Sequence, residues 1–284
     1  MAQLPFFARI WGARGTLASL SGYNSRYGGN TACVEITCGT RRLIFDGGSG
    51  LRMMGDDIMA QRAMLPEGET PDPIHLFFTH CHYDHISALP FFGPFFDPTV
   101  TVNLWSGHLD GPDNTRKMVE NFMSPPYFPV GPEVFSARIA YQDFESGDVL
   151  EPVEGVIIKT MSLNHHDKCI GYRIEFDGRA ICYMTDTTHI PDEPDQNNID
   201  ACRDADLMIY DATYTDEEFP QFWNFGHSTW QEGVRLAKAA GAERLCLFHH
   251  RPSRTDDALD EIGAQARKEF RKCEVGREGL VIAV

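Results

Sequence analysis

Four side chains that commonly bind metal ions occur within six positions of the sequence. They are His80, His82, Asp84 and His85, and they follow the apolar run at residues 74–79. Imidazole and carboxylate ligands together suit Zn²⁺, Fe or Mn²⁺. In an extended chain, residues two apart share a face, so His80 and His82 could hold one ion. Asp84 and His85 lie beyond the predicted strand, where the chain turns, and could reach a second ion.

Other apolar runs also end in residues that can bind metal. The runs at 156–163, 179–184, 207–210 and 244–248 are predicted strands. The polar residues at their ends are His165-His166, Asp186, Asp211 and His249-His250. Strand ends are rigid positions from which a scaffold presents chemical groups, so we expect the chemistry of this protein there.

The order of the predicted elements favours two β-sheets covered by helices. Strands come as hairpins, first at 31–38 with 41–46 and later around Asp177-Gly178, and helices are interspersed. This order differs from a simple βαβ repeat and predicts an α/β protein with an αββα sandwich. Helices are predicted at about 50–65, 114–123, 228–240 and 256–272, the third with Ser228 as its N-cap. We expect one domain over residues 1–284, with a Pro-rich excursion at about 107–135.

The composition argues against some partners. The 284-residue chain has a net charge of −16 and no run of basic residues. Nucleic-acid binding depends largely on Lys and Arg, so a long RNA or DNA substrate is disfavoured, whereas a small anion drawn in by metal ions is not. Eight cysteines without CxxC spacing indicate buried, reduced thiols. We expect a cytoplasmic protein, because the sequence has neither a signal peptide nor an apolar run of membrane-spanning length.

The spacing His80-x-His82-x-Asp84-His85 after an apolar strand resembles the signature of the metallo-β-lactamase superfamily. The resemblance extends over nearly the whole chain and implies the αββα fold and a two-metal hydrolase. Asp46 matches an aspartate that supports the metal loop. The resemblance assigns His80, His82 and His165 to one ion, assigns Asp84, His85 and His249 to the other, and shares Asp186 between them.

A second motif resembles the phosphodiesterase branch of that superfamily, which includes ribonuclease Z and bacterial cyclic-nucleotide phosphodiesterase-like proteins. It is Gly226-His227-Ser228, and it implies that His227 contacts the phosphate and acts as a general acid. Residues 12–16 and 26–35 are similar to the opening of the bacterial subgroup. Arg251 departs from the acidic residue common in that subgroup, and it could bind a phosphate or pair with Asp256 or Asp257.

Several assignments stay open at this stage. His166 could replace His165 as a ligand, and His250 could replace His249. The aromatic loop at 219–225, which includes Trp223, could stack a nucleobase or simply pack against the protein. The Pro-rich stretch at 124–132 could be a lid or a dimer contact.

The leading hypothesis is therefore a dinuclear-metal phosphodiesterase that cleaves a small phosphodiester such as a cyclic nucleotide. Asp84 and His227 would be its catalytic residues, Trp223 a substrate contact and zinc its favoured metal, with manganese or iron as alternatives. A ribonuclease Z-like nuclease and an acyl hydrolase acting on lactones, lactams or thioesters are the alternatives. The resemblance also suggests a homodimer.

Overall fold

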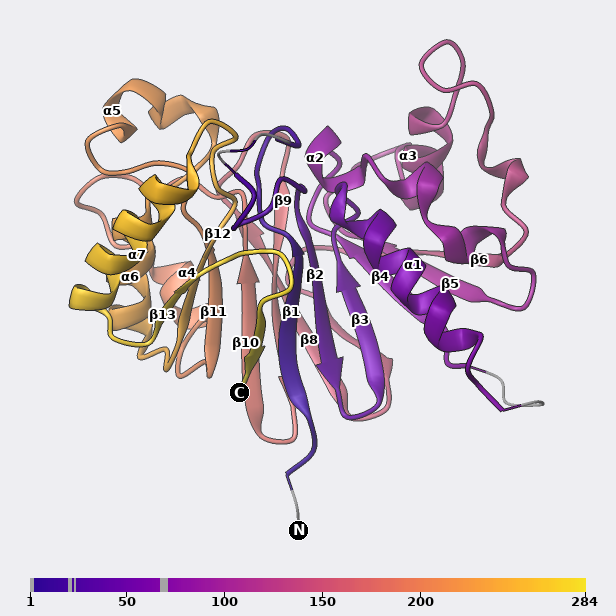
Figure 1. Cartoon of the computed structure of the whole chain (residues 1–284), viewed down its shortest axis with the longest axis horizontal. Helices are drawn as coiled ribbons and strands as arrows, with labels where there is room; N and C mark the ends of the chain where they lie inside the picture. The colour runs from indigo at the N-terminus through magenta and orange to yellow at the C-terminus, as the bar shows by residue number, and fades with distance from the viewer. Residues whose placement is uncertain (1–2, 20–21, 23, 67–70) are drawn as a thin grey trace.

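The computed structural model describes residues 3–19, 22, 24–66 and 71–284. In these residues two seven-stranded sheets lie face to face, and helices cover their outer faces (Figure 1). The predicted αββα sandwich is confirmed. In strand order, the first sheet contains β14 (Val281–Ala283), β1 (Phe6–Gly12), β2 (Cys33–Cys38), β3 (Arg41–Phe45), β4 (Ile74–Phe78), β5 (Thr101–Ser106) and β6 (Arg138–Asp143). The second contains β13 (Cys273–Val275), β12 (Leu245–Phe248), β11 (Leu207–Asp211), β10 (Arg179–Met184), β9 (Cys169–Phe176), β8 (Val156–Leu163) and β7 (Val149–Val153).

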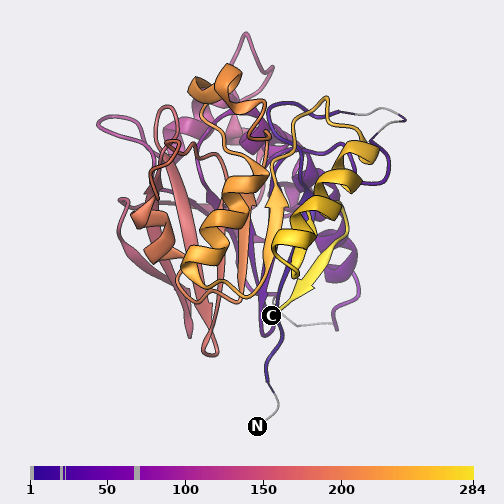
Figure 2. The ribbon, with the colours of Figure 1, turned by 90° about the vertical axis from the view of Figure 1, so that its left-hand side faces the viewer.

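The helices bury an apolar face against each sheet. On the first sheet these helices are α1 (Gly50–Arg62) and α3 (Thr115–Phe122). On the second they are α4 (Gln196–Ala201), α6 (Trp230–Ala240) and α7 (Asp256–Glu269), of which α6 and α7 cross the face seen in Figure 2. The two short helices are α2 (Tyr83–Ile86) and α5 (Phe219–Phe222). No helix in the described part of the chain is both long and apolar enough to cross a membrane.

Aromatic side chains from both sheets fill the interior of the sandwich. The Phe45 ring of β3 stacks on Phe77 of β4 and meets the edges of Tyr172 and Tyr183 from the second sheet. Each of these four side chains is fully buried. Their packing holds the two sheets in one relative position, so residues at the ends of facing strands are also held in place.

Parallel pairing brings the polar strand ends to one edge of the sandwich. β3, β4, β5 and β6 run parallel to one another, and so do β10, β11, β12 and β13. The carboxyl ends of parallel strands meet at the same sheet edge, and in Figure 1 this is the upper edge, beside α2 and α5. The residues that follow β3, β4, β10, β11 and β12 can therefore face one another.

The structure corrects some sequence-based expectations. Asp84 and His85 were expected where the chain turns after the strand, and they lie in the first turn of the short helix α2, which begins at Tyr83. β1, β6, β7 and β13 were not predicted. β6 has a weakly patterned sequence with a charged residue at each end, whereas β1 alternates buried and half-buried residues; both are placed by pairing with neighbouring strands. Seven of the eight cysteines are buried, whereas Cys81 is exposed.

Acid should weaken the fold through His75, which lies near the start of β4, at the opposite end of the strand from the predicted metal ligands. Burial lowers the pKa of His75 to about 4, and the indole N–H of Trp105 donates to its Nδ1 at 3.2 Å. The folded state therefore prefers neutral His75. The stability from this group is fully present above about pH 6.5, the ordinary pKa, and is lost as the pH falls towards 4.

We expect the urea midpoint to fall over this range, and to fall less in His75→Gln, which keeps an acceptor for Trp105. Urea titrations of the chelator-treated proteins at pH 7 and pH 4.5 measure the difference. Equal pH slopes in the two proteins would contradict the prediction.

Candidate metal centre

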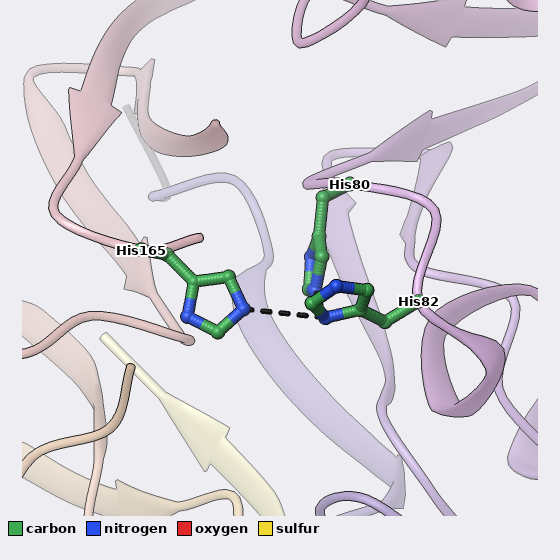
Figure 3. Close-up of side chains that lie close together, drawn as sticks. All are labelled: His80, His82 and His165. Atoms are coloured by element: carbon green, nitrogen blue, oxygen red, sulfur yellow. Dashed lines mark hydrogen bonds between the residues drawn. The ribbon is translucent and has the colours of Figure 1, made fainter. Parts of the chain in front are cut away.

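Three histidines form one cluster, which we call the three-histidine group. His80 and His82 follow β4, and His165 follows β8 (Figure 3). His82 Nδ1 lies 2.8 Å from His80 Nε2 and 3.2 Å from His165 Nε2. His165 Nδ1 donates to the carbonyl of Gly226 at 2.7 Å, so its Nε2 carries a lone pair directed at the cluster. Nitrogen atoms that face one another this closely are arranged to share a cation.

A second cluster, which we call the mixed group, lies beside the first. It contains Asp84, His85, Asp186 and His249, whose ligand atoms lie within 4.8 Å of one another. His249 Nε2 is 3.1 Å from Asp84 Oδ2, and His85 Nε2 is 3.1 Å from Asp186 Oδ2. The other oxygen of Asp186 lies 3.9 Å from both His80 Nε2 and His165 Nε2. Asp186 therefore stands between the two groups, where the sequence analysis expected a shared ligand.

Asp46 holds the start of the metal loop. Its carboxylate accepts hydrogen bonds from the amide and hydroxyl of Thr79, from the hydroxyl of Tyr183 and from His85 Nδ1 at 2.8 Å. The bond to His85 directs the opposite nitrogen, Nε2, towards the mixed group. Because Tyr183 belongs to the second sheet, this carboxylate also links the two sheets beneath the site.

Backbone strain is concentrated at the same edge. Asp46, Asp186 and His249 have φ values of 64°, 56° and 57°, in the left-handed region that residues with a side chain seldom adopt. Each of the three lies within two residues of a strand end. Such a conformation costs on the order of 1 kcal/mol or more and persists only where the surroundings enforce it, often at functional sites.

The buried charges of the mixed group require positive charge. Burial by itself would lower the pKa of His249, but Asp186, Asp84 and Asp211 raise it to about 9. Burial would raise the pKa of Asp186, but His249 and His85 hold it well below its usual value. In the three-histidine group, burial lowers the pKa of His80 and of His165, which favours neutral rings with one unprotonated nitrogen each.

These residues fit a divalent metal ion. His85 Nε2 is buried and has no hydrogen-bond partner, which is costly unless the nitrogen serves another purpose. The donors are imidazole nitrogens and carboxylate oxygens, the set that zinc, iron and manganese accept. The clusters therefore indicate a divalent-metal site.

The structure distinguishes the two histidines of each adjacent pair, His165-His166 and His249-His250. His166 is exposed and its Nε2 lies 2.7 Å from the carbonyl of Asn224, outside both groups. His250 is buried behind the site, where its Nε2 lies 2.9 Å from the carbonyl of Gly276. The structure brings His165 and His249 into the clusters instead, as the sequence analysis preferred.

His227 lies over the two groups and is held by Asp211. His227 Nδ1 is 2.9 Å from Asp211 Oδ2, and its ring stacks on His249 with centroids 4.8 Å apart. Asp211 and His227 also lie close enough to Asp186 and His249 for the four to form a third possible metal-binding group. The oxygens of Asp211 already accept from Thr213 and His227, however, so we interpret Asp211 as a support for His227. The sequence analysis named Asp211 only as a strand end and assigned it no role.

Ser228 is not the helix cap that was predicted. The N-cap of α6 is Thr229, whose hydroxyl accepts from the amide of Glu232. Ser228 is buried, and its hydroxyl oxygen contacts His189 Nδ1 at 2.8 Å and the hydroxyl of Tyr210 at 3.1 Å. Two adjacent residues with equal capping preference cannot be distinguished by sequence alone.

The aromatic loop borders the site. Gly226 has φ +81°, and a Cβ there would lie 2.5 Å from His165 Nδ1, so only glycine allows the loop this close. Trp223 has 64% of its surface exposed. Arg251 lies over the Phe222 ring at 4.8 Å and 3.7 Å from Glu218. Of the two alternatives for Arg251, the pairing with Asp256 or Asp257 is not observed: Arg251 lies beside Glu218, and Arg26 contacts both of those carboxylates.

Comparison with known proteins identifies the family. Residues 41–250 match the model of the beta-lactamase superfamily domain. This chain belongs to that superfamily. It is therefore a metal-dependent hydrolase with the metallo-β-lactamase fold, as the sequence analysis predicted.

Individual relatives cover most of the chain. Ribonuclease Z of Myxococcus xanthus (strain DK1622) is 24% identical over 299 residues, which span 89% of this chain and 92% of the relative. The metallo-beta-lactamase fold protein YhfI from Bacillus subtilis has a TM-score of 0.72 at 18% identity and covers 99% of this chain and 100% of its own. Zn(2+)-bound PqqB from Methylobacterium extorquens has a TM-score of 0.70 at 16% identity, with 98% and 100% covered.

Replacing one carboxylate oxygen of Asp46 with an amide should weaken metal binding by the mixed group. In Asp46→Asn, an amide replaces one of the oxygens that accept from Tyr183 and His85, so His85 loses its fixed orientation. Partners that orient a metal ligand typically contribute about 10- to 100-fold in metal affinity, and we expect a loss of that size. Competition with a chromogenic zinc chelator measures it, with the exposed Asp257→Asn as control. Unchanged affinity in Asp46→Asn would contradict the prediction.

Proposed function

We propose that this protein is a dinuclear-metal phosphodiesterase that cleaves a small phosphodiester such as a cyclic nucleotide. The observation that carries the proposal is the pairing of His227 with Asp211 directly above two adjacent metal-competent groups. The ribonuclease Z relative supports phosphodiester chemistry, because its name denotes cleavage of a nucleic-acid backbone.

The proposed ligands are those of the two groups. His80, His82 and His165 would hold one ion, Asp84, His85 and His249 the other, and Asp186 both. Zinc is the favoured metal, and the zinc-bound structural relative supports that choice, with manganese and iron as alternatives. When bound, two such ions supply hydroxide at neutral pH and neutralise charge that builds on an attacked phosphoryl group. Asp84 would also orient the nucleophile.

His227 would deliver a proton to the leaving oxygen. With Nδ1–H donated to Asp211, the opposite nitrogen, Nε2, is the atom that can give up a proton. The hydrogen bond to the Asp211 carboxylate fixes the orientation of the His227 ring, as a general acid requires. The hydroxyl and amide of Thr213 donate to Asp211 in turn. Thr213 therefore fixes Asp211, and Asp211 fixes the His227 ring that would carry the proton.

Removing His227 tests the reaction class. The His227→Ala substitution should lower kcat for a cyclic nucleotide by about 10²- to 10⁴-fold, because the alkoxide leaving group of this substrate needs a proton. The kcat for bis(p-nitrophenyl) phosphate should fall by a smaller factor, because its leaving group departs without much help from an acid. The distant His75→Gln serves as control, and metal content is measured alongside kcat.

The wild-type protein and His227→Ala are also assayed on a lactone and on a β-lactam. Turnover of either one without any phosphodiester cleavage would support the alternative of an acyl hydrolase on the same metal site.

Trp223 is the proposed contact for a nucleobase. Stacking of one base on an aromatic side chain contributes about 1–3 kcal/mol, which corresponds to about 5- to 150-fold in KM. Trp223→Ala should raise KM by that factor for a cyclic nucleotide but not for the cyclic ribose phosphate that lacks the base. Phe96→Ala removes an exposed aromatic ring outside this loop and is the control. An equal effect on both substrates would argue against stacking.

A ribonuclease Z-like nuclease is the second candidate, because the ribonuclease Z relative spans 89% of this chain. The net charge of −16 opposes it, since a long RNA would meet net repulsion. Cleavage of a precursor-tRNA 3′ trailer at nanomolar enzyme would favour this candidate over a small substrate.

A further inference from the structure

We propose that residues 12–16 form a positioning element for the mixed group, in which Gly15 fixes the ring of His249 and the main-chain amide of Thr16 fixes the carboxylate of Asp84. This inference rests on the proposed role of those two side chains as metal ligands. The loop itself lies outside residues 41–250, which match the family model.

The amide of Thr16 contacts Asp84 directly. Its N–H donates to Asp84 Oδ2 at 2.6 Å, the same oxygen that lies 3.1 Å from His249 Nε2. Hydrogen bonds to an ionised acceptor are short and strong, and this one selects a single rotation of the carboxylate. Thr16 adopts φ 64°, so the backbone is held in an unfavourable conformation in which its N–H points at Asp84.

Gly15 packs flat against His249. A Cβ at position 15 would lie 2.2 Å from Cε1 and Nδ1 of the His249 ring, so no side chain can be accommodated without moving that ring. The hydroxyl of Thr213 lies 3.0 Å from Nδ1, and the His227 ring covers one face. Thr213 donates its own proton to an oxygen of Asp211 or His249, so it accepts from Nδ1–H, and Nε2 faces Asp84 Oδ2.

The loop is fastened to the strand end that carries His249. Gly15 N–H donates to the carbonyl of His250 at 3.0 Å, and His250 N–H donates to the carbonyl of Ala13 at 2.9 Å. The loop and His249 are therefore hydrogen-bonded through adjacent residues and should move together.

Arg14 anchors the loop in the interior. Its guanidinium is 1% exposed, donates to the carbonyls of Gly28 and Arg254, and lies 3.7 Å from Asp256. A buried cation is costly unless it is paired and hydrogen-bonded, so these contacts require one placement of the side chain. The N-terminal loop thus completes a site whose proposed ligands all come from residue 80 onward.

Adding one methyl group tests the proposal. Gly15→Ala is compared with Gly22→Ala, a substitution in the same N-terminal region where a Cβ meets open space. The readouts are bound zinc per chain after dialysis, stepwise zinc affinity by chelator competition, and the melting temperature of the metal-free protein. We expect Gly15→Ala to bind one of its two ions at least about 10- to 100-fold more weakly, as for other groups that orient ligands. Gly22→Ala should match wild type.

A second variant covers the case in which Gly15→Ala fails to fold. Arg14→Lys keeps a charge beside Asp256 but cannot reach the same carbonyls, so it should weaken the same ion by a smaller factor while adding no atom near His249. Unchanged affinity for both ions in the folded variants would overturn the role of the loop. Wild type that binds fewer than two ions would instead refute the proposed two-metal function.

Discussion

The structure depends on keeping buried imidazoles and carboxylates within a few ångströms of one another at one edge of the sandwich. Asp84, His85, Asp186 and His249 are all buried, and the pKa of His249 rises to about 9 because carboxylates surround it. Such a cluster is unfavourable unless positive charge joins it. The fold supplies the restraint: two sheets packed through interlocking aromatic rings hold the strand ends in place, and strained backbone at Asp46, Asp186 and His249 aims their side chains inward.

Three of the proposed ligands are oriented by a contact from another part of the chain. Asp46 orients His85, Gly226 orients His165, and Thr16 orients Asp84. These partners lie on loops from both ends of the sequence, so the site draws on nearly the whole chain. His227 is oriented in the same way by Asp211. In the proposed function, metal binding and proton transfer would belong to neighbouring but separate side chains.

Sequence reasoning reached the fold class and selected histidines that the structure places in the two clusters, because the signals were local. Ligand spacing in residues 80–85 and apolar runs that end in polar residues are properties of short segments. It missed β1, β6 and β13, whose pairing partners lie more than 20 residues away in the sequence, and the edge strand β7, which pairs with the adjacent β8. It also assigned the cap of α6 to Ser228, which instead contacts His189 and Tyr210.

The sequence by itself determined which residue types could bind metal, the superfamily signature and the acidic charge that disfavours long nucleic acids. Tertiary structure decided which of two adjacent histidines enters the site, because His165 and His249 face the clusters while His166 and His250 bond to main-chain carbonyls elsewhere. It also revealed the parts played by Asp211, Gly15 and Thr16. Their roles arise from close approach between segments up to about 240 residues apart, which no local pattern encodes.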